Sequence, residues 1–302
     1  MCEPAESLTI LQPEDWVQLE RKHRDRVQPW IGPRLARRQR GERHPVDDFL
    51  FEYYRLSPSQ LSSWHPGWRH EVVGNPRLSE EVGYRRRSVG HGVDPVVSDR
   101  KRQRMQHAQR LLSATQDRSP GFSCFGLHEW AMVYRTQEVR HEQVPLRLQP
   151  KQIAATVESV GLSCTHFDAY RFFTPAAKQL HPALQRSEQV DLEQPGCIHV
   201  GMDLYRFAYE SLPLVCSELV ADCFEFARDS RNLDMRSSPY DLSAWGLTPI
   251  AIETPEGRRK HAHMQRSLAE RAVPLRRRLV TEIQDALQWV QRRAAVGQAH
   301  SD

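Results

Sequence analysis

The chain has 302 residues, of which 39% are hydrophobic and 26% charged, and its formal net charge is +4. This composition is typical of a soluble globular protein with a core of its own. The mildly basic balance permits a nucleic acid as partner without requiring one. No stretch approaches the roughly 20 apolar residues that cross a bilayer, so the sequence argues against an integral membrane protein.

The cysteines point to a reducing environment. Six are present, and none belongs to a Cys-x-x-Cys pair, which argues against a zinc ribbon or a thioredoxin-type site. The first ten residues carry acids and no apolar run, unlike a signal peptide. We therefore expect reduced, buried thiols and a cytoplasmic location. The residues do not indicate an oligomeric state.

One globular domain is expected over residues 13–295, between a disordered start at 1–12 and a disordered tail at 296–302. A helix is predicted to begin at Pro13, with acids in its first turn, and to break at Pro29 and Pro33. The arginine-rich run that follows, 34–43, fits a solvated turn and an anion-binding patch about equally well.

Glycine, proline and arginine dominate residues 71–99, which predicts a long surface excursion that can act as a lid or binding loop. Short strands are expected within it at 72–73 and 96–97, and another strand at 249–253. Ser217 is expected to cap a helix. Helices are predicted over 47–56, 99–115, 153–160, 217–228, from about 260, and over 274–293. Helices outnumber strands, so we predict a mainly α fold with a few short strands.

Three segments between Phe122 and Phe207 share one composition. Each contains a Cys, a His, a carboxylate and then a Tyr-Arg pair, and they cover 124–135, 164–173 and 197–207; a looser copy covers 44–55. Their Tyr-Arg tyrosines are 36 and 35 residues apart, which fits either a repeated helical unit or separate segments that converge on one pocket. We interpret the four segments as the walls of an active or binding site.

The histidines and carboxylates of these segments predict one candidate chemistry, a metal site. Helical bundles bind metals through facing carboxylates and histidines, and iron, manganese and zinc accept such ligands. The expected ligands are His128, His166 and His199, with Asp168, Asp203 or Glu129. None of these segments contains the Glu-x-x-His pairing of carboxylate di-metal bundles. The alternative is that the histidines are core residues, each hydrogen-bonded to a neighbour.

A second candidate chemistry is cleavage of the glycosidic bond to a nucleobase, which needs a buried carboxylate and aromatic rings that hold a flipped-out base. The catalytic candidates are Asp168, Asp203, His166 and Glu129. The candidates for contact with the substrate are Trp130, Tyr134, Tyr170, Phe172, Tyr205, Arg171 and Arg206. The candidates for contact with DNA phosphates are Arg37, Arg38, Arg40, Arg86 and Arg102.

Several strings of residues resemble a family of actinobacterial proteins usually labelled 3-methyladenine DNA glycosylase. They are FGLHEWAMVYR at 125–135, CTHFDAYRFFTP at 164–175, EQPGC at 193–197, LVADC at 219–223 and LDMRSSPYDL at 233–242. The resemblance extends from about Trp16 to Leu287. It implies removal of alkylated purines such as 3-methyladenine from DNA. The Gly-rich hairpin of the helix-hairpin-helix glycosylases is absent, so the resemblance assigns no catalytic residue.

The leading prediction is therefore a DNA base-excision glycosylase that needs no cofactor and has DNA as its partner. The alternative is a metal-dependent hydrolase or oxygenase that acts on a small molecule with iron, manganese or zinc. A third hypothesis is a nucleic-acid-binding or scaffold protein without a reaction. Clustering of the three histidines in one pocket would favour the metal enzyme, and their dispersal through the core would favour the third.

Overall fold

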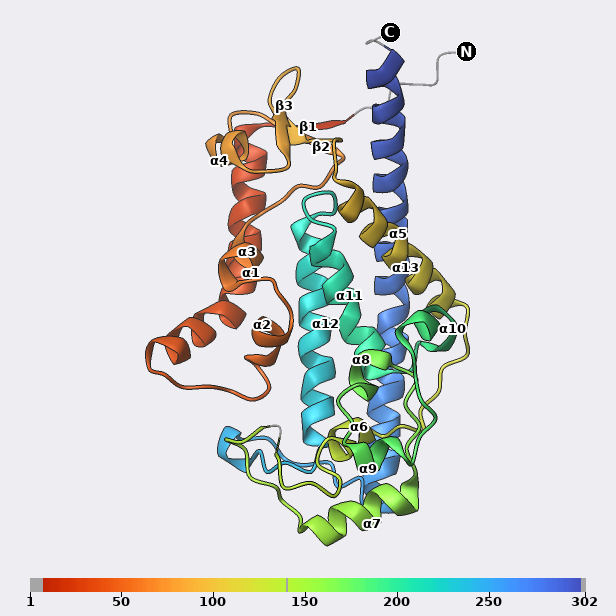
Figure 1. Cartoon of the computed structure of the whole chain (residues 1–302). Coiled ribbons are helices and arrows are strands. Elements are labelled where there is room, and N and C mark those ends of the chain that lie inside the picture. Colours follow the sequence, from red (N-terminus) through yellow and green to blue (C-terminus); the bar gives the residue numbers. More distant parts are fainter. Residues whose placement is uncertain (1–7, 140, 300–302) are drawn as a thin grey trace.

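Helices form most of the chain, as the sequence predicts. The computed structural model describes residues 8–139 and 141–299, and Figure 1 shows its long helices α12 and α13 running side by side, with α1 at one edge. The long elements are α1 (Pro13–Gln39), α5 (Asp99–Gln116), α11 (Ile198–Glu210), α12 (Ser217–Arg236) and α13 (Pro255–Ala299).

Shorter helices connect and cover the long ones. On the N-terminal side they are α2 (Phe49–Tyr53), α3 (Pro58–Ser62) and α4 (Pro76–Glu80). In the middle of the chain they are α6 (Leu127–Ala131), α7 (Pro150–Val160), α8 (Phe167–Tyr170), α9 (Pro175–Lys178) and α10 (Gln189–Leu192). Two 3-10 turns, η1 (Arg186–Glu188) and η2 (Ser243–Trp245), complete the helical elements of the described residues.

The strands form one small sheet in the order β1-β2-β4-β3. β1 (Thr9–Leu11) pairs in parallel with β2 (His70–Val72), and β4 (His91–Val93) pairs antiparallel with β2 and with β3 (Tyr84–Arg86). The start of the chain is therefore ordered from β1, which corrects the disordered start expected through residue 12; residues 1–7 of that expectation lie outside the described residues.

Residues 71–99 contain strands and a short helix rather than forming an irregular loop. The strand expected at 72–73 corresponds to β2, but residues 96–97 form no strand and the other two strands lie at 84–86 and 91–93. The Glu71 carboxylate closes this hairpin, because its Oε1 accepts hydrogen bonds from the amides of Val89 at 2.6 Å and Gly90 at 2.7 Å. A buried carboxylate that accepts backbone amides fixes a loop strongly.

Prolines do not break the long helices, so the predicted breaks are wrong. Pro29 and Pro33 lie inside α1, and Pro274 lies inside α13, which joins the two helices expected at the end of the chain. All three prolines are exposed, so water can solvate the carbonyl groups that they leave without a partner. The buried sides of both helices pack on the core, and this packing offsets the cost of each proline.

Three further expectations at the C-terminal end are corrected. α12 continues to Arg236 rather than 228, and its N-cap is Cys216; Ser217 instead bonds the neighbouring loop, accepting from the His65 amide at 2.7 Å. Residues 249–253 form no strand. α13 extends to Ala299, so part of the tail expected to be disordered is helical, and residues 300–302 lie outside the described part.

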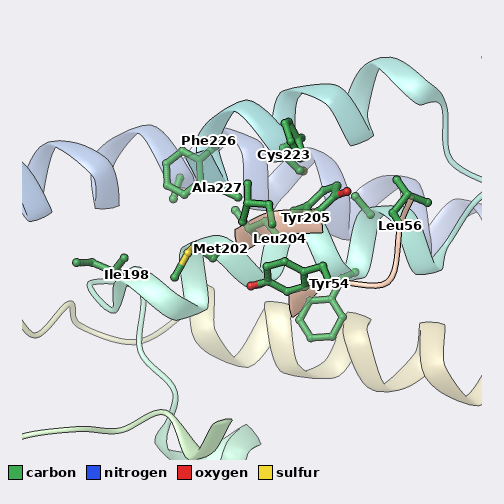
Figure 2. Close-up of a cluster of buried hydrophobic side chains, with 14 of the residues drawn as sticks. Tyr54, Leu56, Ile198, Met202, Leu204, Tyr205, Cys223, Phe226 and Ala227 are labelled. Atoms are coloured by element: carbon green, nitrogen blue, oxygen red, sulfur yellow. The ribbon is translucent and has the colours of Figure 1, made fainter. Parts of the chain in front are cut away.

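The core lies between α11 and α12 and holds the site in place. Figure 2 shows Met202 and Tyr205 of α11 close to Cys223 and Ala227 of α12. Gly201 permits this approach, because a Cβ atom there would lie 2.8 Å from the Phe226 ring. The cost of a glycine inside a helix, about 1 kcal/mol, is offset by this close packing. The same buried cluster includes residues from α1 to α13.

Acid should destabilise this fold through His65. The side chain is buried, its Nδ1 lies 2.9 Å from the Tyr84 hydroxyl, and burial lowers its pKa from 6.5 to about 3. Below pH 6.5, His65 therefore binds a proton in the unfolded chain but not in the folded protein. The contribution of His65 to the free energy of unfolding is fully present above pH 6.5 and decreases as the pH drops toward 3. Between pH 7 and 5 we expect this one group to remove about 2 kcal/mol of unfolding free energy.

Urea unfolding at pH 7 and at pH 5 measures this effect. His65→Gln should reduce the difference between the two pH values by about 2 kcal/mol relative to the wild type. His263→Gln changes an exposed histidine and should leave the difference as it is. Equal pH dependence in the wild type and His65→Gln would show that His65 does not carry this proton linkage.

Candidate metal centre

The four segments singled out in the sequence line one cavity in the described structure. They contribute Phe49, Tyr53 and Tyr54 from the first, Glu129 and Met132 from the second, Asp168, Ala169 and Phe172 from the third, and His199 and Met202 from the fourth. His141 and Arg231 complete the lining. The helices in the three central segments differ in length, from four residues in α8 to 13 in α11. Convergence on one pocket, rather than a repeated helical unit, therefore describes these segments.

The three histidines come together beside this cavity. The ring centroids of His128 and His199 are 4.2 Å apart with the rings edge to face, and those of His166 and His199 are 5.3 Å apart with the rings stacked. His199 stands in the middle, in the first turn of α11. The three rings are therefore neighbours, and His128 and His199 line one common cavity, whereas His166 does not belong to its lining.

Asp234 of α12 completes a set of three potential metal ligands. One ligand atom from each of His128, His199 and Asp234 can be chosen so that all three lie within 4.8 Å of one another. His128 Nε2 and Asp234 Oδ1 are 2.8 Å apart, yet neither atom has a hydrogen-bond partner of acceptable geometry among the described residues. Two ligand atoms on one zinc or iron ion lie roughly 3 to 3.5 Å apart, so these two atoms, which now contact each other directly, would have to separate slightly to share a cation.

A strained turn places His128 in the site. Phe125 and Gly126, which precede α6, both have positive φ, at 45° and 73°. A non-glycine residue in this region is costly, and such strain is concentrated at functional sites. A Cβ atom at Gly126 would lie 3.5 Å from His261 Nε2 and 4.0 Å from Asp234 Oδ1, so the turn also runs close against the far side of the cluster.

His261 of α13 lies on that side and was not predicted from the sequence. It is fully buried, and neither ring nitrogen has a hydrogen-bond partner among the residues that the structure describes. Burial lowers the pKa of His261 to about 4, so the ring is neutral at pH 7. A neutral buried imidazole with no partner is unusual in a folded protein, and it marks this end of the site as built for an additional group.

Arg231 neutralises the two carboxylates beside the histidines. Its side chain is 1% exposed, and one guanidinium nitrogen donates to Glu129 Oε1 and to Asp234 Oδ2, both at 2.7 Å. Burial alone would raise the pKa of Asp234, but His128 and Arg231 lower it well below its ordinary value. Asp234 is therefore a carboxylate at neutral pH, which is the form that binds a metal ion.

A second charged network adjoins the cluster through His166. His166 Nε2 lies 3.3 Å from Asp203 Oδ2 and 3.5 Å from Glu193 Oε1. Burial alone would lower the pKa of His166, but the two carboxylates raise it. Burial alone would raise the pKa of Asp203, but Arg206 and His166 lower it to about 2. Asp203 is thus an ion-paired carboxylate at neutral pH.

Asp168 is surrounded by arginines. Its carboxylate lies 2.8 Å from Arg186, 3.2 Å from Arg206 and 3.4 Å from Arg171. Arg171 and Arg206, which were expected to contact a substrate, therefore bind this buried acid. The two acids expected to act on a glycosidic bond, Asp168 and Asp203, both sit in ion pairs, and Asp203 does not line the described cavity.

The aromatic residues expected to hold a substrate lie in different places. Phe172 lines the cavity. Trp130 is buried elsewhere and donates its indole N–H to the Ser237 carbonyl at 2.8 Å. The remaining contacts are the Tyr134 hydroxyl with Glu158, the Tyr170 ring with Phe173, and the Tyr205 ring with Phe224. Tyr53 and Tyr54 of the first segment line the cavity with Phe172 instead of the other aromatic residues predicted to do so.

The arginines expected to follow DNA phosphates do not form one surface. They belong to the end of α1 and the turn after it, to β3 and to α5, which lie in separate parts of Figure 1. Three of them are ion-paired: Arg37 with Asp48, Arg40 with Glu42, and Arg102 with Asp99. Arg38 and Arg86 are exposed.

Asp234, Arg231 and His261 were missed for identifiable reasons. The helix predicted over 217–228 stops before Arg231 and Asp234, so their i, i+3 spacing on one helix face lies outside the prediction. His261 and Gln265 are four residues apart among apolar positions of α13 and are both buried. That spacing is the signal that could have found His261.

Comparison with family models, with curated proteins and with solved structures found no match to this chain. Within the described residues, no helix is long and apolar enough to cross a membrane. The five cysteines among these residues are free thiols, of which Cys197 and Cys223 are buried as expected and the other three are partly exposed.

Proposed function

We propose that this protein is a metal-dependent enzyme acting on a small molecule, with His128, His199 and Asp234 as the metal ligands. The observation that carries the proposal is the approach of these three ligand atoms to within 4.8 Å of one another. Two imidazoles and one carboxylate form the ligand set of many catalytic zinc sites and of non-haem iron(II) oxygenases. Both a hydrolase and an oxygenase fit this set.

Burial and hydrogen bonding support the assignment. His128 and Asp234 are buried, and the two atoms that face each other, Nε2 and Oδ1, have no other partner among the described residues. The second oxygen of Asp234 accepts from Arg231, as outer hydrogen bonds orient metal ligands in general. A cation bound by both atoms would replace their direct contact of 2.8 Å.

Glu129 supplies an acid–base group next to these ligands. It lines the cavity beside His199, and its Oε2 accepts no hydrogen bond from a described residue and lies 3.8 Å from His141 Nε2. Burial alone would raise the pKa of Glu129, but Arg231 lowers it, so the group is a carboxylate that can accept a proton. A metal ion held by His128, His199 and Asp234 would supply Lewis-acid chemistry, and Glu129 would offer a carboxylate beside these ligands.

Metal analysis of the purified protein tests the proposal. After incubation with Fe(II), Mn(II) or Zn(II) and desalting, the wild type should retain about one ion per chain for at least one of these metals. Asp234→Asn and His199→Asn should weaken binding by at least about tenfold, since even outer-sphere changes cost 10- to 100-fold. Asp168→Asn alters a buried carboxylate outside the ligand set and should retain the ion. Equal retention in all four proteins would reject the assignment.

The glycosylase activity implied by the family resemblance stays a prediction, as does DNA as a partner. Release of 3-methyladenine from alkylated DNA by the metal-free wild type is the measurement that would establish it. Activity that survives Asp234→Asn and requires Asp168 or Asp203 would favour the glycosylase over the metal enzyme.

A further inference from the structure

We infer that the cavity between α1, the start of α12 and α13 binds a small zwitterion with an apolar body, such as an amino acid with an aromatic side chain. The cavity has a volume of about 350 Å³, which lies within the range of small-molecule sites. Glu218, which lines it, and Asp234 of the proposed metal centre are 16 residues apart on α12, or about 24 Å along the helix. Binding here is therefore independent of the proposed function.

One side of α1 forms part of the lining. Four residues of this helix line the cavity at the spacing i, i+3, i+4 and i+7, which places side chains on one side of a helix; they are Leu19, Lys22, His23 and Arg26. Other segments add apolar surface through Leu11, Trp64 and Pro66. An apolar body bound among these side chains would be removed from water, which favours binding.

Ion pairs hold the helices around the cavity together without a ligand. Asp222 of α12 lies 2.7 Å from Arg26 of α1 through Oδ1 and 2.7 Å from Arg278 of α13 through Oδ2. Arg26 also pairs with Glu225 at 2.9 Å. Arg26 and Arg278 both line the cavity, and both already have carboxylate partners. The charges left for a ligand are therefore those of the other two charged lining residues, Lys22 and Glu218.

Lys22 and Glu218 carry opposite charges, and neither forms an ion pair with a residue that the structure describes. The Lys22 side chain is exposed and has no hydrogen bond within the described part of the chain. Glu218 is half-buried, and its Oε1 accepts a hydrogen bond from the Trp64 indole at 3.2 Å. Burial lowers the pKa of His23 and of His70, so these lining histidines are neutral at pH 7 and do not balance Glu218.

Two opposite charges that line one cavity without pairing with each other favour a ligand that carries both. The carboxylate of a zwitterion can accept from the Lys22 ammonium, and its own ammonium can donate to the Glu218 carboxylate. A ligand with a single charge satisfies only one of the two residues, and a hydrocarbon satisfies neither. The apolar body then packs on surface such as that of Leu19 and Trp64, so a zwitterion with such a body complements the whole lining.

Three probes of similar shape test the charge requirement. 4-Fluorophenylalanine carries both charges, 3-(4-fluorophenyl)propanoate carries only the carboxylate, and 4-fluorophenethylamine carries only the ammonium. Their affinities are measured by ¹⁹F NMR titration of the wild-type chain at pH 7 and low ionic strength. Ion pairs at exposed positions are weak, so the amino acid should bind about three- to fivefold more tightly than either of the other probes. Equal affinities, or tighter binding of a probe with one charge, would overturn the inference.

Charge variants identify which residue binds which end of the ligand. Lys22→Gln should weaken binding of the amino acid and the propanoate by about three- to fivefold without weakening that of the amine. Glu218→Gln keeps an acceptor for Trp64 and should weaken binding of the amino acid and the amine without weakening that of the propanoate. Lys151→Gln removes an exposed lysine of α7 and should change no affinity. If each of the first two variants affected all three probes equally, or none of them, the inference would be wrong.

Two apolar residues of α1 locate the bound body. Leu19→Ser changes a lining residue that is 37% exposed and should weaken all three probes by about the same factor, whereas Val17→Ser changes a 49% exposed residue outside the lining and should leave the affinities within about twofold. Thermal unfolding of each variant confirms that it is folded. Unchanged affinities in Leu19→Ser, or binding that is lost in Asp234→Asn, would place the probes elsewhere and overturn the inference.

Discussion

Replacing Arg231 by methionine is expected to lower the free energy of unfolding by about 3 to 5 kcal/mol. The guanidinium is buried and donates to Glu129 and Asp234, which are 3% and 0% exposed. Without it, the two carboxylates would face each other in the core with no countercharge from α12. Removing one member of a buried ion pair leaves an uncompensated charge, and losses of this size are the usual result.

Urea unfolding at pH 7 measures this loss, and Arg271→Met is the matched control. Arg271 pairs with Asp229 at 2.6 Å, but both side chains are about half exposed, at 51% and 47%, and exposed pairs contribute only about 0 to 1 kcal/mol. A loss below about 1 kcal/mol for Arg231→Met would mean that the carboxylates are neutralised in another way.

The double variant Arg231→Met, Glu129→Gln identifies the source of the loss. If repulsion between unpaired carboxylates dominates, removing the charge of Glu129 should recover about 1 to 2 kcal/mol relative to Arg231→Met alone. An additive loss from the two substitutions would instead assign the effect of Arg231 to packing, since its guanidinium also lies 3.9 Å from the centroid of the Phe49 ring.

The mainly α fold could be predicted because long helices have amphipathic patterns that tertiary packing reinforces. α11 and α12 have such patterns, and the helix predicted from residue 217 corresponds to α12. The ends of the helices, and whether a proline breaks a helix, could not be predicted, because both depend on which side of the helix faces the core. Pro29 and Pro33 lie on the exposed side of α1, and no local rule in the sequence states which side that is.

The site was predictable in part for a related reason. A Cys, a His, a carboxylate and a Tyr-Arg pair recur in segments 124–135, 164–173 and 197–207, and this composition was enough to place all of them at one pocket. The third ligand could not be found in the same way. Asp234 lies outside these three segments, and its carboxylate reaches His128 only because α12 continues to Arg236.

Chemical roles were less predictable than positions. Asp168 and Asp203 look alike in the sequence as candidate catalytic acids, yet arginines bind both of them in the fold. Glu129 and Asp234 differ from them, because each keeps one oxygen without a hydrogen-bond partner among the described residues. Part of this difference comes from contacts between residues 38 and 102 positions apart, Arg206 with Asp168 and Arg231 with Glu129, which spacing within one segment does not encode.

Removing a metal ion bound at the proposed site should destabilise the wild type by about 4 kcal/mol when the free ion was present at roughly a thousandfold excess over its dissociation constant. Such an ion would bind the folded chain, in which His128, His199 and Asp234 are already assembled, far better than the unfolded chain, in which they are not. Urea unfolding with and without EDTA, at one pH and one ionic strength, gives the difference directly.

The same comparison in Asp234→Asn should show a difference below about 0.5 kcal/mol, because an amide oxygen without charge is a poor ligand for these ions. Arg231→Met makes the sharper test. A cation between His128 and Asp234 would partly replace the charge of the lost guanidinium, so metal should stabilise this variant at least as much as it stabilises the wild type. Stabilisation of Asp234→Asn equal to that of the wild type would mean that the ion binds elsewhere on the chain, and the ligand assignment would then be wrong even if the protein retains metal.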